Sequence, residues 1–190
     1  MEIIHYHFKC LDSTNDWAKQ RIKSFDRDKI TLVTANCQKK GRGQYGRTWF
    51  SPDGINIYGS FCFFTKTDAF PTLSFTHLLA NTIAGILRAY GVNSHLKWPN
   101  DLIVNQKKIA GILCETTPFS TISGVVLGLG LNINMSESDL KQIDQPATSL
   151  YMETNKKWDF TQVLSDLKKH FSIQLAQFLK MQFIHVRDHN

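Results

Sequence analysis

Hydrophobic residues recur at helical spacing in two long segments of the chain. Between residues 72 and 90, apolar side chains fall three or four positions apart, and Gly91 follows as a stop signal. The same spacing recurs over residues 160–181, from Phe160 to Leu179. Both segments are therefore predicted to be amphipathic helices that pack one face on a core.

Shorter apolar runs, bounded by polar residues, Gly or Pro, predict strands. A further helix of about 12 residues is predicted from Ser13, because its hydroxyl can cap the first turn and Asp16 completes the spacing of a capping box. Strands are expected at residues 3–10, 30–37, 55–65, 94–98, 102–104, 109–116 and 122–134.

The order of these elements favours hairpins over a strict alternation of strand and helix. We therefore expect an α+β fold with a mixed, mostly antiparallel sheet backed by helices on one face. The 190 residues, 42% hydrophobic and 20% charged, suit one globular domain. No apolar run reaches the roughly 18 residues that span a bilayer, and no secretory signal is visible, so a cytoplasmic protein without membrane contact is expected.

Four cysteines are scattered along the chain without a CxxC motif, at positions 10, 37, 62 and 114. Each lies in an apolar stretch that resembles a strand. We expect reduced thiols, as is usual in a cytosolic protein.

Positive charge is concentrated in one loop. The formal net charge is +6, and Lys39, Lys40, Arg42 and Arg47 follow one another without an intervening acid. Elsewhere most basic residues alternate with Asp and Glu, as on solvated faces. A local cluster of this kind favours a small anionic ligand over a polynucleotide.

The same loop contains GRGQYGR (residues 41–47), which matches the GxGxxG spacing of dinucleotide-binding proteins. In those proteins a helix follows at once, whereas TWFSPDG (48–54) cannot begin a long helix. Glycine amides can still surround phosphate oxygens, arginines add forked donors, and Trp49 offers a flat surface. The alternative is a flexible surface turn with incidental arginines.

Two further segments could carry chemistry. In KWPND (97–101), Pro99 restricts the backbone and holds Lys97 as a fixed charge for a carboxylate or phosphate. In GLGLN (128–132), two glycines in an apolar strand indicate a close backbone or ligand approach next to Asn132. A surface turn and a bulged core strand, respectively, are the alternatives.

Taken together, these segments resemble the biotin protein ligases, which attach biotin to biotin-dependent carboxylases. The resemblance follows the family's order along the chain. It is carried by residues 12–15, Gln38, GRGQYGRTWFSP (41–52), KWPNDLIV (97–104), KKIAGIL (107–113) and GLGLNIN (128–134).

The resemblance implies a catalytic domain related to class II aminoacyl-tRNA synthetases. It also implies a two-step reaction. Biotin and ATP first form biotinyl-5'-AMP and pyrophosphate, with Mg²⁺ accompanying ATP. A lysine of a biotin carboxyl carrier domain then takes the biotinyl group.

The resemblance also assigns roles to residues. Lys97 and Arg42 are the expected catalytic cations, and Trp49 is expected to cover the adenine. The biotin side comprises Ser13, Thr14, Asn15, Gln38, Arg42, Gly43, Gln44 and Lys97. The ATP and adenylate side comprises Arg47, Trp49, Asn100, Asp101, Lys108 and Asn132, with Mg²⁺ held by ATP and Asp101 as a candidate neighbour.

The sequence departs from the family pattern in several places. Gln44 stands where many bacterial members have an arginine, so looser retention of the adenylate is expected. Residues 1–182 are expected to form the catalytic domain and residues 183–190 a short tail, with neither an N-terminal helix-turn-helix domain nor a C-terminal SH3-like domain. A homodimer is left open.

Three alternatives stay open. A lipoate ligase or octanoyltransferase shares the fold superfamily, but its arginine-rich motif with consecutive glycines is not seen. A truncated module could bind biotin without transferring it, although the retained Lys97, Asn100 and Asp101 argue against this. A nucleic-acid-binding protein would show steep salt dependence, and no DNA binding is expected.

Overall fold

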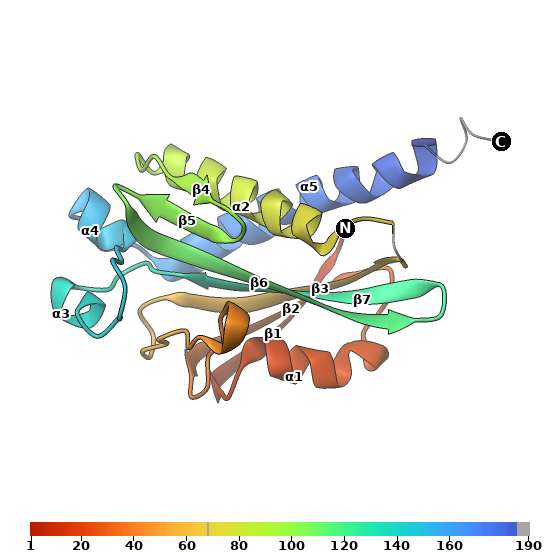
Figure 1. Cartoon of the computed structure of the whole chain (residues 1–190), viewed down its shortest axis with the longest axis horizontal. Helices are drawn as coiled ribbons and strands as arrows, with labels where there is room; N and C mark the ends of the chain where they lie inside the picture. The colour runs from red at the N-terminus through yellow and green to blue at the C-terminus, as the bar shows by residue number, and fades with distance from the viewer. Residues whose placement is uncertain (68, 186–190) are drawn as a thin grey trace.

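A seven-stranded sheet forms the centre of the protein in a computed structural model that describes residues 1–67 and 69–185 (Figure 1). Its strands, in spatial order, are β1 (Ile3–Leu11), β2 (Ile30–Gln38), β3 (Ile57–Lys66), β7 (Ile122–Leu131), β6 (Lys107–Phe119), β5 (Asp101–Val104) and β4 (His95–Lys97). β1 and β2 pair in parallel, and the other described neighbours are antiparallel. The predicted mixed, mostly antiparallel sheet is confirmed.

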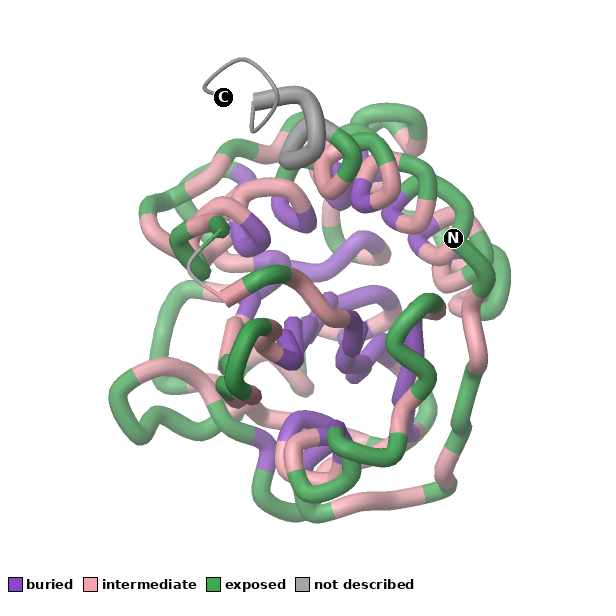
Figure 2. Tube along the Cα trace, turned by 90° about the vertical axis from the view of Figure 1, so that its right-hand side faces the viewer, coloured by how far each residue is buried: buried purple, intermediate pink, exposed green. Residues whose placement is uncertain are grey.

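Two long helices cover one face of this sheet. α2 (Thr72–Ala89) and α5 (Phe160–His185) pack against each other and against β6 and β3. Their buried side chains join those of the strands in the main core, which includes Phe75, Leu79, Phe171 and Leu127. Figure 2 shows the buried positions gathered in the interior, on the strands and on the inward sides of the helices.

A shorter helix lies on the opposite face. α1 (Thr14–Arg21) packs on β2, β3 and β7, where Ala18 contributes to a second, smaller core with Val33 and Val126. Figure 1 shows α1 below the sheet and α2 and α5 above it. The expectation that all helices lie on one face was therefore wrong, because the strands carry apolar residues on both faces.

Several smaller elements were not predicted from the sequence. They are the short helices α3 (Glu137–Leu140) and α4 (Leu150–Thr154) and the 3-10 turns η1 (Ile22–Ser24) and η2 (Gln44–Gly46). Ser136 and Asp139 form a capping box that starts α3. α5 continues to His185, beyond the predicted end at residue 181, because no Gly or Pro interrupts it. The rest of the expected tail, residues 186–190, lies outside the described residues.

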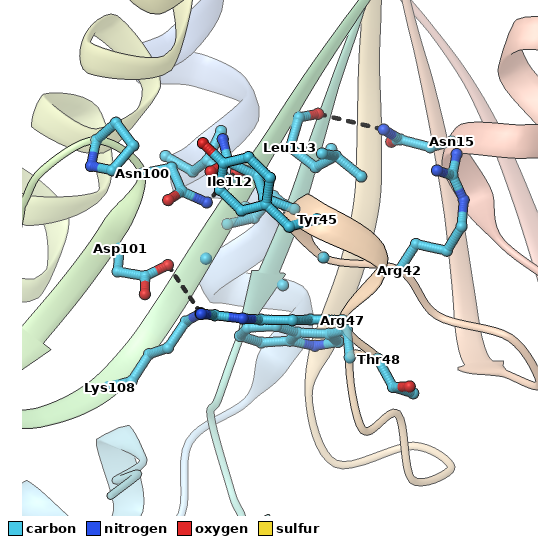
Figure 3. A pocket seen from close by; sticks show the side chains of 18 of the residues that line it. Asn15, Arg42, Tyr45, Arg47, Thr48, Asn100, Asp101, Lys108, Ile112 and Leu113 are labelled. Carbon is cyan, nitrogen blue, oxygen red and sulfur yellow. Dashed lines mark hydrogen bonds and ion pairs between the residues drawn. The ribbon is translucent and has the colours of Figure 1, made fainter. Parts of the chain in front are cut away.

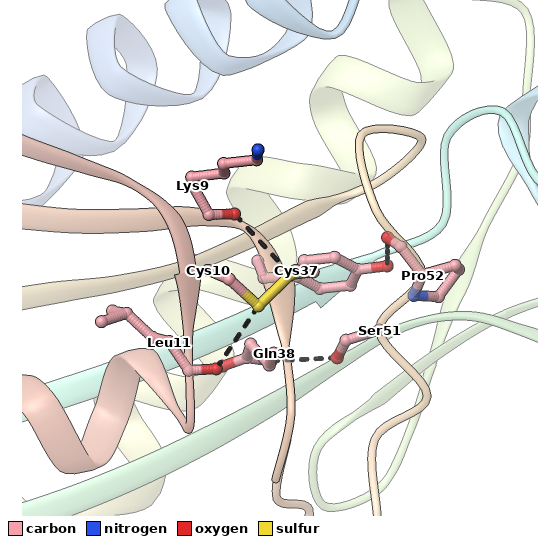
Figure 4. The surroundings of a disulfide bond; sticks show 8 residues. Lys9, Cys10, Leu11, Cys37, Gln38, Ser51 and Pro52 are labelled. Atoms are coloured by element: carbon pink, nitrogen blue, oxygen red, sulfur yellow. Dashed lines mark hydrogen bonds between the residues drawn. A yellow bond between two sulfur atoms is a disulfide. The ribbon is translucent and has the colours of Figure 1, made fainter.

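A disulfide joins Cys10 and Cys37 (Figure 4). The parallel register of β1 and β2 places these two residues opposite each other, with their Cα atoms 4.8 Å apart. The expectation of reduced thiols was wrong for this pair, since residues 27 positions apart are brought together only by strand pairing. Cys62 and Cys114 are free, and burial, with a smaller contribution from the nearby Glu115 charge, raises the pKa of the Cys114 thiol to about 12.

Within the described residues, no helix combines the length and apolar character needed to cross a bilayer.

Candidate active site

A cavity of about 340 Å³ opens on the α1 face of the sheet. It is lined by the start of α1, the loop after β2, the turn between β4 and β5, parts of β6 and β7, and Gln145. Thirteen of the fourteen residues singled out from the sequence contribute to its wall. They are Ser13, Thr14, Asn15, Gln38, Arg42, Gly43, Gln44, Arg47, Trp49, Lys97, Asn100, Asp101 and Lys108. Asn132 lines a smaller adjacent pocket, which shares Trp49 and Lys108 with the main cavity.

The two ends of the cavity differ in chemistry. Figure 3 shows Asn15 and Arg42 on one side and the linked pair Asp101 and Lys108 on the other, with Tyr45 between them. The first end is built mostly from hydroxyl and amide groups, with Arg42 paired to carboxylates beside them, and the second from charged side chains and an indole. Residues that are far apart in sequence, and that were predicted to bind biotin or ATP, thus line one cavity.

The amide and hydroxyl end is rigid because its buried polar groups bond to one another. Ser13 caps α1 by accepting a hydrogen bond from the Asp16 amide at 3.3 Å. The backbone amide of Thr14 donates to Gln38 Oε1 at 2.9 Å. Ser60 on β3 donates to Asn15 Oδ1 at 2.6 Å. Polar groups that are satisfied in this way are costly to rearrange, so this end is preorganised.

Glycines on β6 and β7 make space for side chains on this face. A Cβ atom at Gly128 would lie 2.3 Å from Asn15 Oδ1. A Cβ atom at Gly130 would lie 2.1 Å from Trp49 Cε2, and one at Gly111 would lie 2.8 Å from Trp49 Cζ3. A close approach to the GLGLN segment is present as predicted, but the approaching groups are the side chains of Asn15 and Trp49, not a backbone or ligand.

The glycine-rich loop has a defined conformation. The amide of Trp49 donates to Gly41 O at 2.9 Å, and the amide of Gly43 donates to Arg47 O at 2.7 Å. At the tip, Tyr45 has a φ of 57° and a side chain that is 91% exposed. The loop is therefore closed on itself at the base and presents an aromatic ring at its tip.

Arg42 is held by two carboxylates. Its guanidinium contacts Asp16 on α1 and Glu115 on β6, the latter at 3.0 Å. Hydrogen bonds that Arg42 donates to Asp16, opposed in part by burial and helped by the charge of Glu115, raise the pKa of Arg42. The side chain therefore fastens the loop to the sheet, and its expected catalytic role stays a prediction.

The charged end is organised around Trp49. The Lys108 ammonium lies 2.7 Å from Asp101 Oδ1 and 5.1 Å from the centre of the Trp49 ring. Asn132 donates from Nδ2 to Thr148 O at 3.0 Å. Its Oδ1, like Trp49 Nε1, is buried without a hydrogen-bond partner in the described part of the chain. Such orphaned polar atoms suit a bound ligand, ion or water.

Lys97 lines the cavity from the last position of β4 and is exposed. Within the described residues, its ammonium makes no hydrogen bond or ion pair. The turn after it is stiff: Asn100 Nδ2 donates to Ile112 O at 2.9 Å, and the Ile112 amide donates back to Asn100 O at 3.0 Å. Trp98, next to a cis bond to Pro99, is 69% exposed at the mouth.

Two residues of the site were missed in the sequence. Ser60 is a fully buried polar residue within an otherwise apolar strand, a pattern that could have drawn attention to it. Glu115 lies two positions after the KKIAGIL motif, but its partners lie 73 to 100 positions away along the chain. Only the folded arrangement identifies it as part of the site.

Comparison with known protein families gives the class to which this fold and site belong. The model of the biotin/lipoate A/B protein ligase family matches residues 7–132, and the chain belongs to this family.

Individual relatives are more specific. The chain is 31% identical over 160 residues to the bifunctional ligase/repressor BirA of Bacillus spizizenii, a match that covers 83% of this chain and 49% of the relative. It is 31% identical over 173 residues to the biotin–[acetyl-CoA-carboxylase] ligase of Mycobacterium tuberculosis, covering 87% and 62%. The chain thus spans about half the length of the bifunctional relative.

Among solved structures, a biotin protein ligase from Aquifex aeolicus in complex with biotin and ATP superimposes with a TM-score of 0.75. The two chains are 31% identical, and the match covers 94% of this chain and 72% of the other.

Proposed function

We propose that this chain activates biotin with ATP and transfers the biotinyl group to a lysine of a biotin carboxyl carrier domain. The observation that carries the proposal is a single cavity with a preorganised end of mostly hydroxyl and amide groups and a second end that carries Arg47 and Lys108, with Lys97 also in its wall. The first end suits a polar, uncharged head group, and the second suits phosphates. The biotin and ATP bound to the Aquifex relative support the same pair of substrates.

The first step joins two anions. A carboxylate oxygen of biotin attacks the α-phosphorus of ATP, the bond to the bridging oxygen breaks, and pyrophosphate leaves. All three cations line the cavity: Lys97 would reduce the repulsion between carboxylate and phosphate, and Arg47 and Lys108 would add charge at the ATP end. The protein supplies no nucleophile, so the rate depends on in-line positioning.

The second step forms an amide. The ε-amine of the carrier lysine attacks the activated carbonyl, AMP leaves, and the amine gives up a proton. A mixed anhydride is also open to attack by water, so the cavity mouth has to be covered between the steps. Tyr45 at the loop tip and Trp98 in the turn before β5 are exposed aromatic residues that line the cavity, and they are the candidates for this cover.

Magnesium would accompany ATP at the charged end. Among the described residues, no group of three His, Cys, Asp or Glu side chains could hold a metal, so the phosphates would supply most ligands. The orphaned Asn132 Oδ1 and the Asp101 carboxylate are oxygen donors of the type that Mg²⁺ prefers, and both border Lys108. Bound there, the ion would neutralise phosphate charge.

The test combines the protein with biotin, Mg-ATP and a carrier domain, followed by mass spectrometry. We expect biotinyl-5'-AMP in the reaction without carrier and a carrier mass increased by one biotinyl group in the complete reaction. Controls omit biotin or ATP. Absence of both products would contradict the proposal, and adenylate without modified carrier would restrict it to the first step.

A further inference from the structure

Glu115 occupies a junction between three segments of the active site. It lies on β6, and its side chain is 16% exposed. Its carboxylate accepts hydrogen bonds from Lys19 at 2.7 Å, from Asn15 at 2.9 Å and from Arg42 at 3.0 Å. Two of these donors are on α1 and the third is on the glycine-rich loop.

The contact with Asn15 determines which way that amide points. Asn15 Nδ2 donates to Glu115 Oε2 and to Leu113 O, whereas Oδ1 accepts from Ser60. A carboxylate cannot donate, so a rotated amide would place an oxygen against an oxygen and lose these bonds. Glu115, together with the Leu113 carbonyl, therefore fixes the donor and acceptor pattern at the hydroxyl and amide end of the cavity.

The contact with Arg42 joins the loop to the same atom. Oε2 of Glu115 accepts from both Asn15 and Arg42. Asp16 is the second carboxylate that holds Arg42. Arg42 donates to it from Nε at 3.1 Å and also from Nη2. The position of the loop and the orientation of Asn15 are thereby linked through one carboxylate oxygen.

The four charged side chains in the cluster around Glu115 include equal numbers of acids and bases. Asp16 and Glu115 face Lys19 and Arg42, so a half-buried carboxylate is compensated by two cations. Burial alone would raise the pKa of Glu115, but hydrogen bonds from Lys19 and Asn15 and the Arg42 charge lower it overall. The residue stays ionised at neutral pH.

We propose that Glu115 is a positioning residue: it orients Asn15 toward the biotin head group and ties this orientation to closure of the loop through Arg42. The role rests on the proposed biotin-activating function, and it assigns Glu115 to binding of biotin and retention of the adenylate, with no contact to reacting atoms.

The test is a kinetic comparison of E115Q with the wild type in biotin-dependent pyrophosphate release. Glutamine keeps the size and removes the charge. We expect the KM for biotin to rise about tenfold, as for loss of a charged hydrogen bond. The KM for ATP should stay within twofold, and more free adenylate should accumulate in solution.

Two further variants separate the parts of this role. D16N weakens the other anchor of Arg42 without touching Asn15, so it should increase adenylate release and leave the KM for biotin within twofold. E137Q removes an exposed carboxylate on α3, which is paired with Lys141 and does not line the cavity, and should leave both quantities unchanged.

A double-mutant cycle measures the link through Arg42. The effect of E115Q on adenylate release should be at least threefold smaller in an R42Q background, because the contact is already broken there.

An E115Q protein with normal unfolding and an unchanged KM for biotin would overturn the proposal, as would a fall in kcat alone. If E115Q does not fold, E115D takes its place, with a smaller increase in KM expected and an unchanged KM again contradictory. A wild type without biotin-dependent activity would overturn the proposed function itself, which no behaviour of the variants can do.

Discussion

The two faces of the sheet differ in composition: one packs the main hydrophobic core and the other lines the cavity. The α2 and α5 face is packed with large apolar side chains and holds most of the buried core. The α1 face has a small core beside a cavity lined by hydroxyl, amide and charged groups. One face supplies stability and the other supplies the site, although the same strands form both.

Strand β7 makes the contrast visible within one segment. Leu127 and Leu129 point into the main core, whereas Gly128 and Gly130, which alternate with them, open space for Asn15 and Trp49. Substitutions on neighbouring positions of one strand should therefore have different consequences: loss of folding free energy on one face and loss of ligand affinity on the other.

The largest effect is expected for Lys97→Ala. Lys97 is a cation of the cavity wall, and removing one preorganised charge typically costs a factor of about 100 to 1,000 in rate. Adenylate formation, followed as pyrophosphate release, should fall by that factor while the thermal unfolding midpoint is unchanged. Lys107→Ala is the matched control, since Lys107 is outside the cavity wall. Near-normal adenylate formation by Lys97→Ala would remove this residue from the catalytic machinery.

Leu127→Ala should mainly affect stability. The side chain is fully buried in the main core, so its truncation should lower the free energy of unfolding by about 3 kcal/mol in urea titrations. At a temperature where the variant is still folded, the KM values for biotin and ATP should stay within twofold of the wild type. A large change in either KM would contradict the claim that this face of the sheet contributes to stability and not to ligand binding.

Gly128→Ala should mainly affect biotin. The added Cβ would meet Asn15 Oδ1 and push the amide away from Ser60, so the KM for biotin should increase about tenfold, as for one lost hydrogen bond in a buried site. Titration of biotin in the same assay, at saturating ATP, measures this. An unchanged KM would show that Asn15 does not contact the substrate.

The smallest effect is expected for Gln44→Arg. Gln44 lines the cavity at the start of η2, where an added guanidinium could form a charge-assisted bond with the adenylate phosphate. We expect about threefold less free biotinyl-5'-AMP in solution than with the wild type, by an estimate for one exposed charged contact. Equal or greater release would contradict looser retention by the wild type.

Local patterns in the sequence predicted the parts of the fold that depend on neighbouring residues. The cap of α1 at Ser13 was found because the capping signal spans only four positions. The close approach at Gly128 was inferred because glycines interrupt an apolar strand. The resemblance to a known family then brought distant motifs to one site.

Features that depend on the pairing of distant segments were missed. The Cys10–Cys37 disulfide follows from the register of two parallel strands, and the role of Glu115 follows from β6 passing beside α1. α1 on the second face was also missed, since hydrophobic spacing shows which side of an element is buried and not which face of the sheet it covers.

The central claim is that the cavity binds biotin and ATP for their reaction with each other. The most direct test measures pyrophosphate release from Mg-ATP with biotin or lipoate as the only acid, and then with both in competition. The account predicts release with biotin, none above background with lipoate, and no inhibition by excess lipoate. Release that depends on lipoate, or no release with biotin, would contradict it.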